Sequence, residues 1–267
     1  MGQTEIIAYF LSVLVGISLG LIGGGGSILT LPILVYFLGI NPVLSTAYSL
    51  FIVGSTSLVG SYSFIKKGLI HFKTALIFSI PSLFSVFVTR KFIVPAIPEH
   101  LFSLGNFDVD KNLAIMLLFA IVMLLASYSM ISGSKPEEKK SEGLNFNIPL
   151  IATEGSLVGM LTGLVGAGGG FLIIPALVIL VRLPMKMAVG TSLLIIAAKS
   201  LIGFLGDVGT QKIDWFFLLS FTACSILGIL LGSYLNKYIS GEKLKKSFGF
   251  FVLLMAIYIL LKEILFT

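Results

Sequence analysis

Charged side chains are scarce in this chain of 267 residues. Asp, Glu, Lys and Arg make up 11% of it, whereas hydrophobic residues make up 57%. A soluble domain carries about a quarter charged residues, because its surface faces water. The composition therefore excludes an ordinary soluble enzyme or binding domain and indicates a protein that is embedded in a membrane.

Cysteine and histidine are almost absent. The single cysteine, Cys224, lies inside an apolar run, and the only histidines are His71 and His100. A disulfide framework or a thiolate metal site needs several cysteines, and a helical metalloprotease signature needs two histidines four residues apart. The sequence also lacks paired acid and base residues, so it predicts no catalytic residue, no metal and no cofactor, and the protein is not expected to be an enzyme.

The excess of positive charge does not indicate a nucleic-acid partner. The formal charge is +6 and the pI is near 9.3, but the basic residues lie in short loops between apolar runs. Cytoplasmic loops of membrane proteins are enriched in Lys and Arg. The expected partners are therefore the lipid bilayer and a small solute, with no nucleic acid.

Long apolar runs occupy most of the chain. A spanning helix needs roughly 20 apolar residues, and a bilayer admits only helices or closed barrels. Continuous runs, without the alternation typical of barrel strands, favour helices and an all-α polytopic membrane protein. The runs cover residues 5–22, 43–65, 74–89, 112–132, 186–206, 215–236 and 247–261.

One segment occurs twice, at an offset of 143 residues. Residues 20–35 read GLIGGGGSILTLPILV, residues 163–178 read GLVGAGGGFLIIPALV, and nine of the sixteen positions are identical. The identities include glycines and a proline, which chance does not match in an apolar chain. The sequence therefore predicts a first membrane repeat at 1–132, a cytoplasmic linker at 133–147 and a second membrane repeat at 148–267.

Each repeat has an odd number of crossings in this interpretation. An apolar run reaches a glycine cluster, a second run of about 13 residues follows, and three spanning helices complete the repeat. Thirteen residues make about 20 Å of helix, so the two segments around the glycines are expected to form a broken or re-entrant pair. Three further crossings then invert the second repeat relative to the first.

The loop charges predict the orientation in the cell membrane. With both termini outside and the linker in the cytoplasm, twelve of the eighteen basic residues face the cytoplasm, as the positive-inside rule requires. The remaining six are Arg90, Lys91, Lys111, Lys199, Lys212 and Lys262.

The glycine clusters are the predicted anion site. A helix that begins inside the membrane presents unpaired N–H groups and the positive end of its dipole, which bind anions. Inverted repeats with broken helices are typical of transport sites near the bilayer midplane. The alternative is that the glycines only allow close helix packing. The predicted binding residues are Gly23, Gly24, Gly25, Gly26, Ser27, Gly166, Gly168, Gly169 and Gly170.

Polar side chains in the following helices complete the predicted site. Ser49, Thr191 and Ser192 are expected to donate to oxyanion oxygens, unless they bond back to their own helix carbonyls. Lys199 lies about 22 Å from the start of its helix; it either balances the charge of the anion or snorkels to the outer headgroups. His71 and Asp214, which are 143 residues apart, are expected to cap helices rather than to relay protons.

The duplicated motif resembles the TauE/SafE family of sulfite and organosulfonate exporters. The likeness rests on GGGGSILTLP in the first half and on the matching glycines and GTSLL in the second, and it extends over nearly the whole chain. It implies export of sulfite, sulfoacetate or a related organosulfonate. The family pattern falls on Gly190, Thr191 and Ser192, whereas Ala47, Tyr48 and Ser49 stand at the matching place in the first half and are expected to narrow one side of the site.

The sequence thus predicts a secondary transporter that exports a small sulfur-containing anion by alternating access. A proton is a candidate coupling ion. Two alternatives remain: a permease for another anion such as sulfate or a carboxylate, and a membrane assembly or accessory protein that transports nothing.

Overall fold

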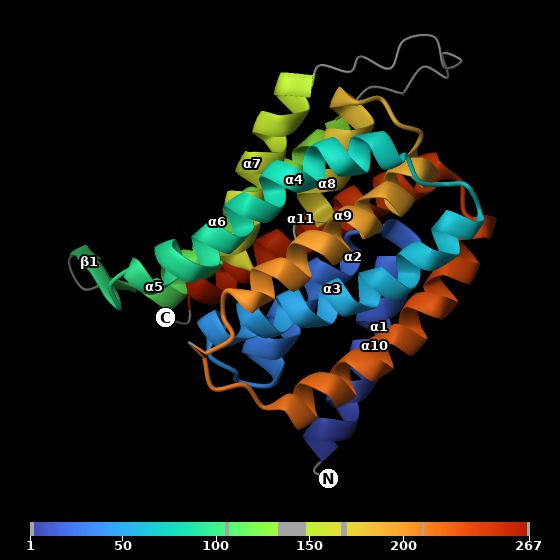
Figure 1. Ribbon diagram of the computed structural model, residues 1–267. Helices are drawn as coiled ribbons and strands as arrows, with labels where there is room; N and C mark the ends of the chain where they lie inside the picture. Colours follow the sequence, from blue (N-terminus) through green and yellow to red (C-terminus); the bar gives the residue numbers. More distant parts are fainter. Residues whose placement is uncertain (1–2, 105–106, 133–147, 167–169, 210, 266–267) are drawn as a thin grey trace.

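The computed structural model describes residues 3–104, 107–132, 148–166, 170–209 and 211–265. It is mostly helical, as the sequence predicts (Figure 1). Among the described residues, five helical segments are long and apolar enough to cross a membrane: Pro42–Lys66, Phe72–Ala96, Lys111–Ser132, Met185–Leu205 and Trp215–Tyr238. Shorter apolar helices cover Ile7–Ile22, Ile28–Phe37 and Pro149–Val165. The protein is therefore a multi-pass membrane protein.

Two pairs of helices pack through glycines in the same way. Helix α1 (Gln3–Ile22) lies along α10 (Trp215–Leu235), and α7 (Ile148–Val165) lies along α4 (Phe72–Val88) (Figure 1). Gly16 of α1 faces the backbone of α10, and Gly159, which is 143 residues later, faces the backbone of α4. Small residues let two helix backbones approach closely inside a membrane. The α1–α10 contact therefore has an equivalent in α7–α4.

Helices α3 (Pro42–Lys66) and α9 (Met185–Leu205) form the centre of the molecule. They pack against each other, and each also packs against α4 or α10. Larger shares of these two spans are buried, 67% and 72%, than of the other three. Helices α3 and α9 are therefore the most buried of the five candidate spans.

Helices α6 (Lys111–Ser132) and α11 (Gly241–Leu265) pack together at one side. Leu125 and Leu254 on these helices, and Phe84 on α4, are each at least 65% exposed. Apolar side chains on the outside suit contact with lipid tails. Helix α11 occupies the place of the sixth expected span, which the sequence puts at the C-terminal end.

The helix starts follow the chemistry of their first residues. Pro42 opens α3, where its missing N–H costs no hydrogen bond, and the Asn41 side chain accepts the Val43 N–H at 2.9 Å. The side chains of His71 and Asp214 accept N–H groups at the starts of α4 and α10. The prediction that these two residues are helix caps is confirmed.

A β-hairpin, which the sequence did not predict, accompanies the helices. Strands β1 (His100–Leu104) and β2 (Phe107–Asp110) pair antiparallel after the short helix α5 (Val94–Ala96). The hairpin stands out from the helical body at one end (Figure 1). The segment between two spans is long enough to pair with itself outside the membrane. The length and apolar content of the neighbouring spans gave no indication of a hairpin between them.

We expect Gly16→Val to destabilise the protein, because a side chain at this position would run into the Ser225 carbonyl and the Ile229 N–H. Overpacking of this kind costs about 1–3 kcal/mol, so the melting temperature in detergent should fall. Leu14→Val is the matched control, because Leu14 is 40% exposed on the same helix. Equal melting temperatures for the two variants would contradict the close α1–α10 packing.

Candidate functional site

Gly23 and Gly166 each follow the end of a helix with a similar backbone conformation. Gly23 ends α1 with φ +77° and Gly166 ends α7 with φ +70°, a region that glycine adopts without strain. The Gly23 N–H donates to the Leu19 carbonyl and the Gly166 N–H to the Thr162 carbonyl, both at 2.7 Å. The chain then continues as α2 (Gly25–Pro32) with a π-helical turn, η1 (Ile33–Phe37), and as α8 (Gly170–Pro175) with η3 (Ala176–Leu180).

The two breaks lie against each other in the interior. A Cβ atom built on Gly170 would lie 2.6 Å from the Gly24 Cα and 3.0 Å from the Gly23 carbonyl oxygen. Gly23, Gly24, Gly166 and Gly170 are all buried. Backbone therefore meets backbone at this point, which leaves no room for any side chain at Gly170.

The start of α2 has no side-chain cap. Gly24 is the N-cap residue, and it has no side chain that could accept a hydrogen bond. The first N–H groups of a helix have no partner within the helix, and they attract negative charge. The structure thus places the amino end of a helix at a buried junction of two glycine breaks, where an anion is a suitable partner.

Other members of the predicted glycine set differ in role or are not described. Gly26 packs its α-carbon against Leu19 of α1, and its carbonyl accepts the Thr30 hydroxyl at 2.7 Å. Gly26 is thus a packing position, and Gly25 begins α2. Gly168, Gly169 and the side chain of Ser27 lie outside the described part of the structure.

Ser192 lies beside the first break. Its hydroxyl donates to the Gly23 carbonyl at 3.3 Å and to the Val189 carbonyl at 2.8 Å. The contact with Val189 is a bond back to its own helix, as the alternative expects, whereas the contact with Gly23 reaches the first break. Ser49, which occupies the equivalent position of α3, is buried and has no hydrogen-bond partner in the described structure. Its hydroxyl is available to a ligand.

Thr191 faces a neighbouring helix. Its hydroxyl accepts the His71 N–H at 3.0 Å, and the Tyr48 hydroxyl accepts the Asp214 N–H at 2.8 Å. Tyr48 and Thr191 are 143 residues apart, as are His71 and Asp214. The Tyr48 ring packs beside Phe217. Tyr48 and Thr191 thus tie α3 and α9 to the starts of α10 and α4.

Lys199 is fully buried in the centre of α9. Its Nζ donates to the Thr162 hydroxyl at 2.9 Å. One of the two expectations was that this side chain snorkels to the headgroups. Its burial shows that it does not. Thr162 lies one turn before Gly166, so the ammonium group lies next to the end of α7 and the second glycine break.

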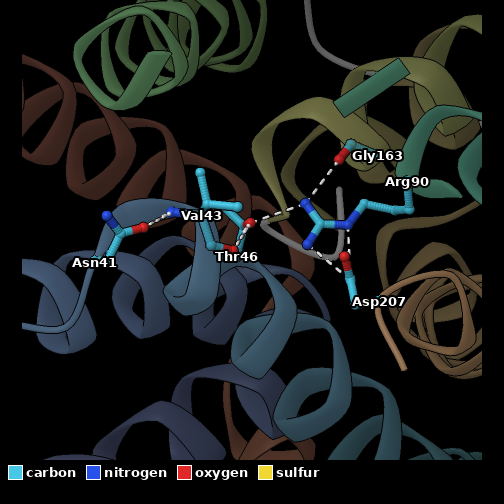
Figure 2. Close-up of polar contacts among 6 residues, drawn as sticks. All are labelled: Asn41, Val43, Thr46, Arg90, Gly163 and Asp207. Carbon is cyan, nitrogen blue, oxygen red and sulfur yellow. Dashed lines mark hydrogen bonds and ion pairs between the residues drawn. The ribbon is translucent and has the colours of Figure 1, made fainter. Parts of the chain in front are cut away.

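A second buried cation, Arg90, lies at the same end of α7 (Figure 2). Its guanidinium pairs with Asp207 at 2.7–2.8 Å and donates to the Thr46 hydroxyl at 2.9 Å and the Gly163 carbonyl at 3.2 Å. Arg90 lies on the π-helical turn η2 (Thr89–Ile93) that follows α4. The cation therefore connects four helices and satisfies a carbonyl at the broken end of α7.

The sequence-based interpretation missed the pairing of Arg90 with Asp207, because it counted Arg90 only among the basic residues outside the cytoplasmic loops. The internal repeat contains a signal for them. Ser233 stands at the position equivalent to Arg90, Phe64 at that of Asp207 and Thr56 at that of Lys199. At these three positions the charge occurs in one repeat only, and the side chain is buried.

Asp207 lies beyond the last residue of the α9 span and is buried. Burial raises its pKa above the ordinary value of an aspartate, and the charge and hydrogen bond of Arg90 act in the opposite direction. The effect of burial is the larger one, so the pKa of Asp207 is raised overall. The carboxylate thus depends on Arg90 for its stability in this buried place.

A cavity of about 450 Å³ opens elsewhere, between the starts of α1, α3 and α10. Asp214 is the one acidic residue of its lining, and the other lining residues are apolar or tyrosine. A carboxylate in an apolar cavity repels anions. The cavity lining is Ala8, Tyr9, Leu38, Ile40, Leu44, Tyr48, Asp214, Phe216 and Phe217.

We expect Arg90→Met to destabilise the protein strongly, because it leaves Asp207 buried without its partner. Removing one member of a buried ion pair costs about 3–5 kcal/mol, whereas replacing both is often close to neutral. The double variant Arg90→Met/Asp207→Asn should therefore melt at a higher temperature than Arg90→Met alone. The same melting temperature for both would show that the pair is unimportant to the fold.

Gly166→Ala should cost more stability than Gly39→Ala. Both glycines have positive φ, but a Cβ on Gly166 would run into Thr46, whereas nothing lies within 4 Å of a Cβ on Gly39. Arg182 already adopts φ 60° at the position equivalent to Gly39. Gly39→Ala should therefore lose only the conformational term of about 1 kcal/mol, which thermal unfolding of both variants measures. A smaller loss for Gly166→Ala would contradict the contact with α3.

Comparison with known proteins identifies the family of this chain. The family model "Sulfite exporter TauE/SafE" matches residues 8–259. A probable membrane transporter protein of Xylella fastidiosa (strain 9a5c) is 30% identical over 263 residues, 97% of this chain and 95% of the relative. The probable membrane transporter protein YunE of Bacillus subtilis (strain 168) is 27% identical over 87% of this chain and 88% of its own length. No solved structure matches significantly. The chain belongs to the sulfite exporter TauE/SafE family of membrane transporters.

Proposed function

We propose that the protein exports a small sulfur-containing anion, such as sulfite, sulfoacetate or a related organosulfonate, by alternating access. The observation that carries this proposal is the buried meeting of two glycine breaks, Gly23–Gly24 and Gly170, beside the uncapped start of α2. Membership of the sulfite exporter TauE/SafE family supports the substrate class. An oxyanion would accept the amide hydrogens that the break exposes.

The proposal includes two inverted repeats, 1–132 and 148–267, joined by a cytoplasmic linker at 133–147. Contacts between helices support it, because each has a counterpart when the two halves are exchanged. The pair α1–α10 corresponds to α7–α4, and α2–α3 corresponds to α8–α9. The pairs α3–α9 and α6–α11 each map onto themselves. Such an arrangement allows one half to tilt against the other around a fixed site.

The proposed orientation has both termini outside and the linker in the cytoplasm. Under it, α2 with η1 returns to the outer side, and α8 with η3 returns to the inner side. The two glycine breaks then approach each other from opposite sides of the membrane. Each contacts a central helix of the other half, since Gly23 lies against Val189 of α9 and Gly166 against Thr46 of α3.

Ser49 is the proposed hydroxyl donor to the anion. Its side chain has no partner in the described structure, so Ser49→Ala should leave the melting temperature unchanged. A lost hydrogen bond to a charged ligand should raise the KM for sulfite about tenfold, which flux into proteoliposomes measures. Ser225→Ala removes another buried hydroxyl without a partner, on α10, and should transport sulfite like the wild type.

The outcome of the flux measurement separates the proposed function from its alternatives. Saturable flux of sulfite or a sulfonate in wild-type proteoliposomes, with no such flux in liposomes without protein, supports export of a sulfur oxyanion. If only a carboxylate is transported, the substrate is a carboxylate and not a sulfur oxyanion. Absence of flux for every anion offered would favour a membrane assembly or accessory protein.

A further inference from the structure

Four ionisable side chains are buried in the described structure, and three of them have an ion-pair partner. Arg90 and Asp207 pair with each other, and Lys111 lies 3.7 Å from Glu99. Lys199 has no carboxylate within ion-pair distance in the described part of the chain. A buried lysine must face a partner or a cavity, because an unpaired charge at membrane depth costs several kcal/mol.

Lys199 shares one face of α9 with the residues that touch the glycine breaks. Ser192, Ile196 and Lys199 are spaced i, i+4 and i+7, which puts them on one side of a helix. Ser192 bonds to Gly23, a Cβ on Gly170 would touch Ile196, and Lys199 bonds to Thr162, one turn before Gly166. This face of α9 therefore runs from the first break to the second.

We infer that Lys199 is the charge-matching residue of the anion site and that it restricts the cargo to singly charged oxyanions. Of the proposed cargoes, this selects hydrogensulfite and simple sulfonates over the doubly charged sulfite and sulfoacetate ions. The inference rests on the proposed function, because it assigns the ligand of that same site. The Arg90–Asp207 pair adds no net charge, so one cation faces the breaks. A singly charged sulfonate or hydrogensulfite balances it, whereas sulfate would leave one negative charge buried without compensation.

The repeat places the charge on one side of the site. The equivalent of Lys199 in α3 is Thr56, so the two central helices differ in charge at the same position. The nearest carboxylate along α7 is Glu154, eight residues before Thr162 and therefore about 12 Å along the helix. It is partly buried, and it does not pair with Lys199 in the described structure.

The test compares a singly and a doubly charged probe on the purified full chain. Binding of methanesulfonate and of sulfate is measured by thermal stabilisation, and their flux by counterflow in proteoliposomes. The wild type should bind methanesulfonate at least about tenfold more tightly than sulfate, and Lys199→Met should lose about tenfold or more of its methanesulfonate affinity. Lys91→Met is the matched control, because Lys91 is an exposed lysine, and it should bind like the wild type.

Each outcome either supports or overturns the inference. Equal or tighter binding of sulfate by the wild type, or unchanged methanesulfonate binding by Lys199→Met, overturns the inference and leaves the proposed transport function standing. Binding of neither probe, without flux of any anion by the wild type, overturns both. If Lys199→Met does not give a monodisperse protein, Lys199→Thr takes its place, and the wild-type preference between the two probes tests the inference independently.

Discussion

The whole arrangement depends on one constraint: a helix that is broken inside a membrane must find partners for its exposed backbone groups, because no water is there to bind them. At the carboxyl ends of the breaks the protein supplies donors. Asn236 donates to the Leu21 carbonyl, Ser192 to the Gly23 carbonyl and Arg90 to the Gly163 carbonyl. At the amino end of α2 the N-cap residue, Gly24, supplies no side-chain acceptor. The carbonyl ends thus receive donors from within, and in the proposed function a ligand meets the amide end.

This asymmetry connects the fold with the function. The glycines permit the break and the close contact of two backbones, and the tightly packed pairs α1–α10 and α4–α7 hold the broken helices in place. The central helices α3 and α9 bring polar side chains to the junction. The Arg90–Asp207 pair neutralises itself while it fixes the end of α7. Lys199 has no carboxylate within ion-pair distance in the described part of the chain, and in our inference the ligand balances its charge.

Much of this architecture was predictable, because it is written in local chemistry. The apolar runs predicted the spans, the sequence predicted caps at His71 and Asp214, and the duplicated glycines predicted the breaks at Gly23 and Gly166. The Arg90–Asp207 pair was not predicted, because a charge at the end of an apolar run looks the same whether it meets headgroups or another helix. The π-helical turns and the β-hairpin were also not predicted, because tertiary packing and strand pairing determine them. The hydrogen bond from the Asp214 N–H to the Tyr48 hydroxyl was not predicted for the same reason.

The most direct measurement of the central claim is the position of a bound anion. An anomalous difference map from crystals grown with bromomethanesulfonate would locate the bromine atom. The account predicts a peak between the Gly23–Gly24 segment and Gly170, with the sulfonate oxygens toward the start of α2 and the ammonium group of Lys199. A single peak in the cavity beside Tyr48 and Asp214, or at the headgroup level, would contradict it.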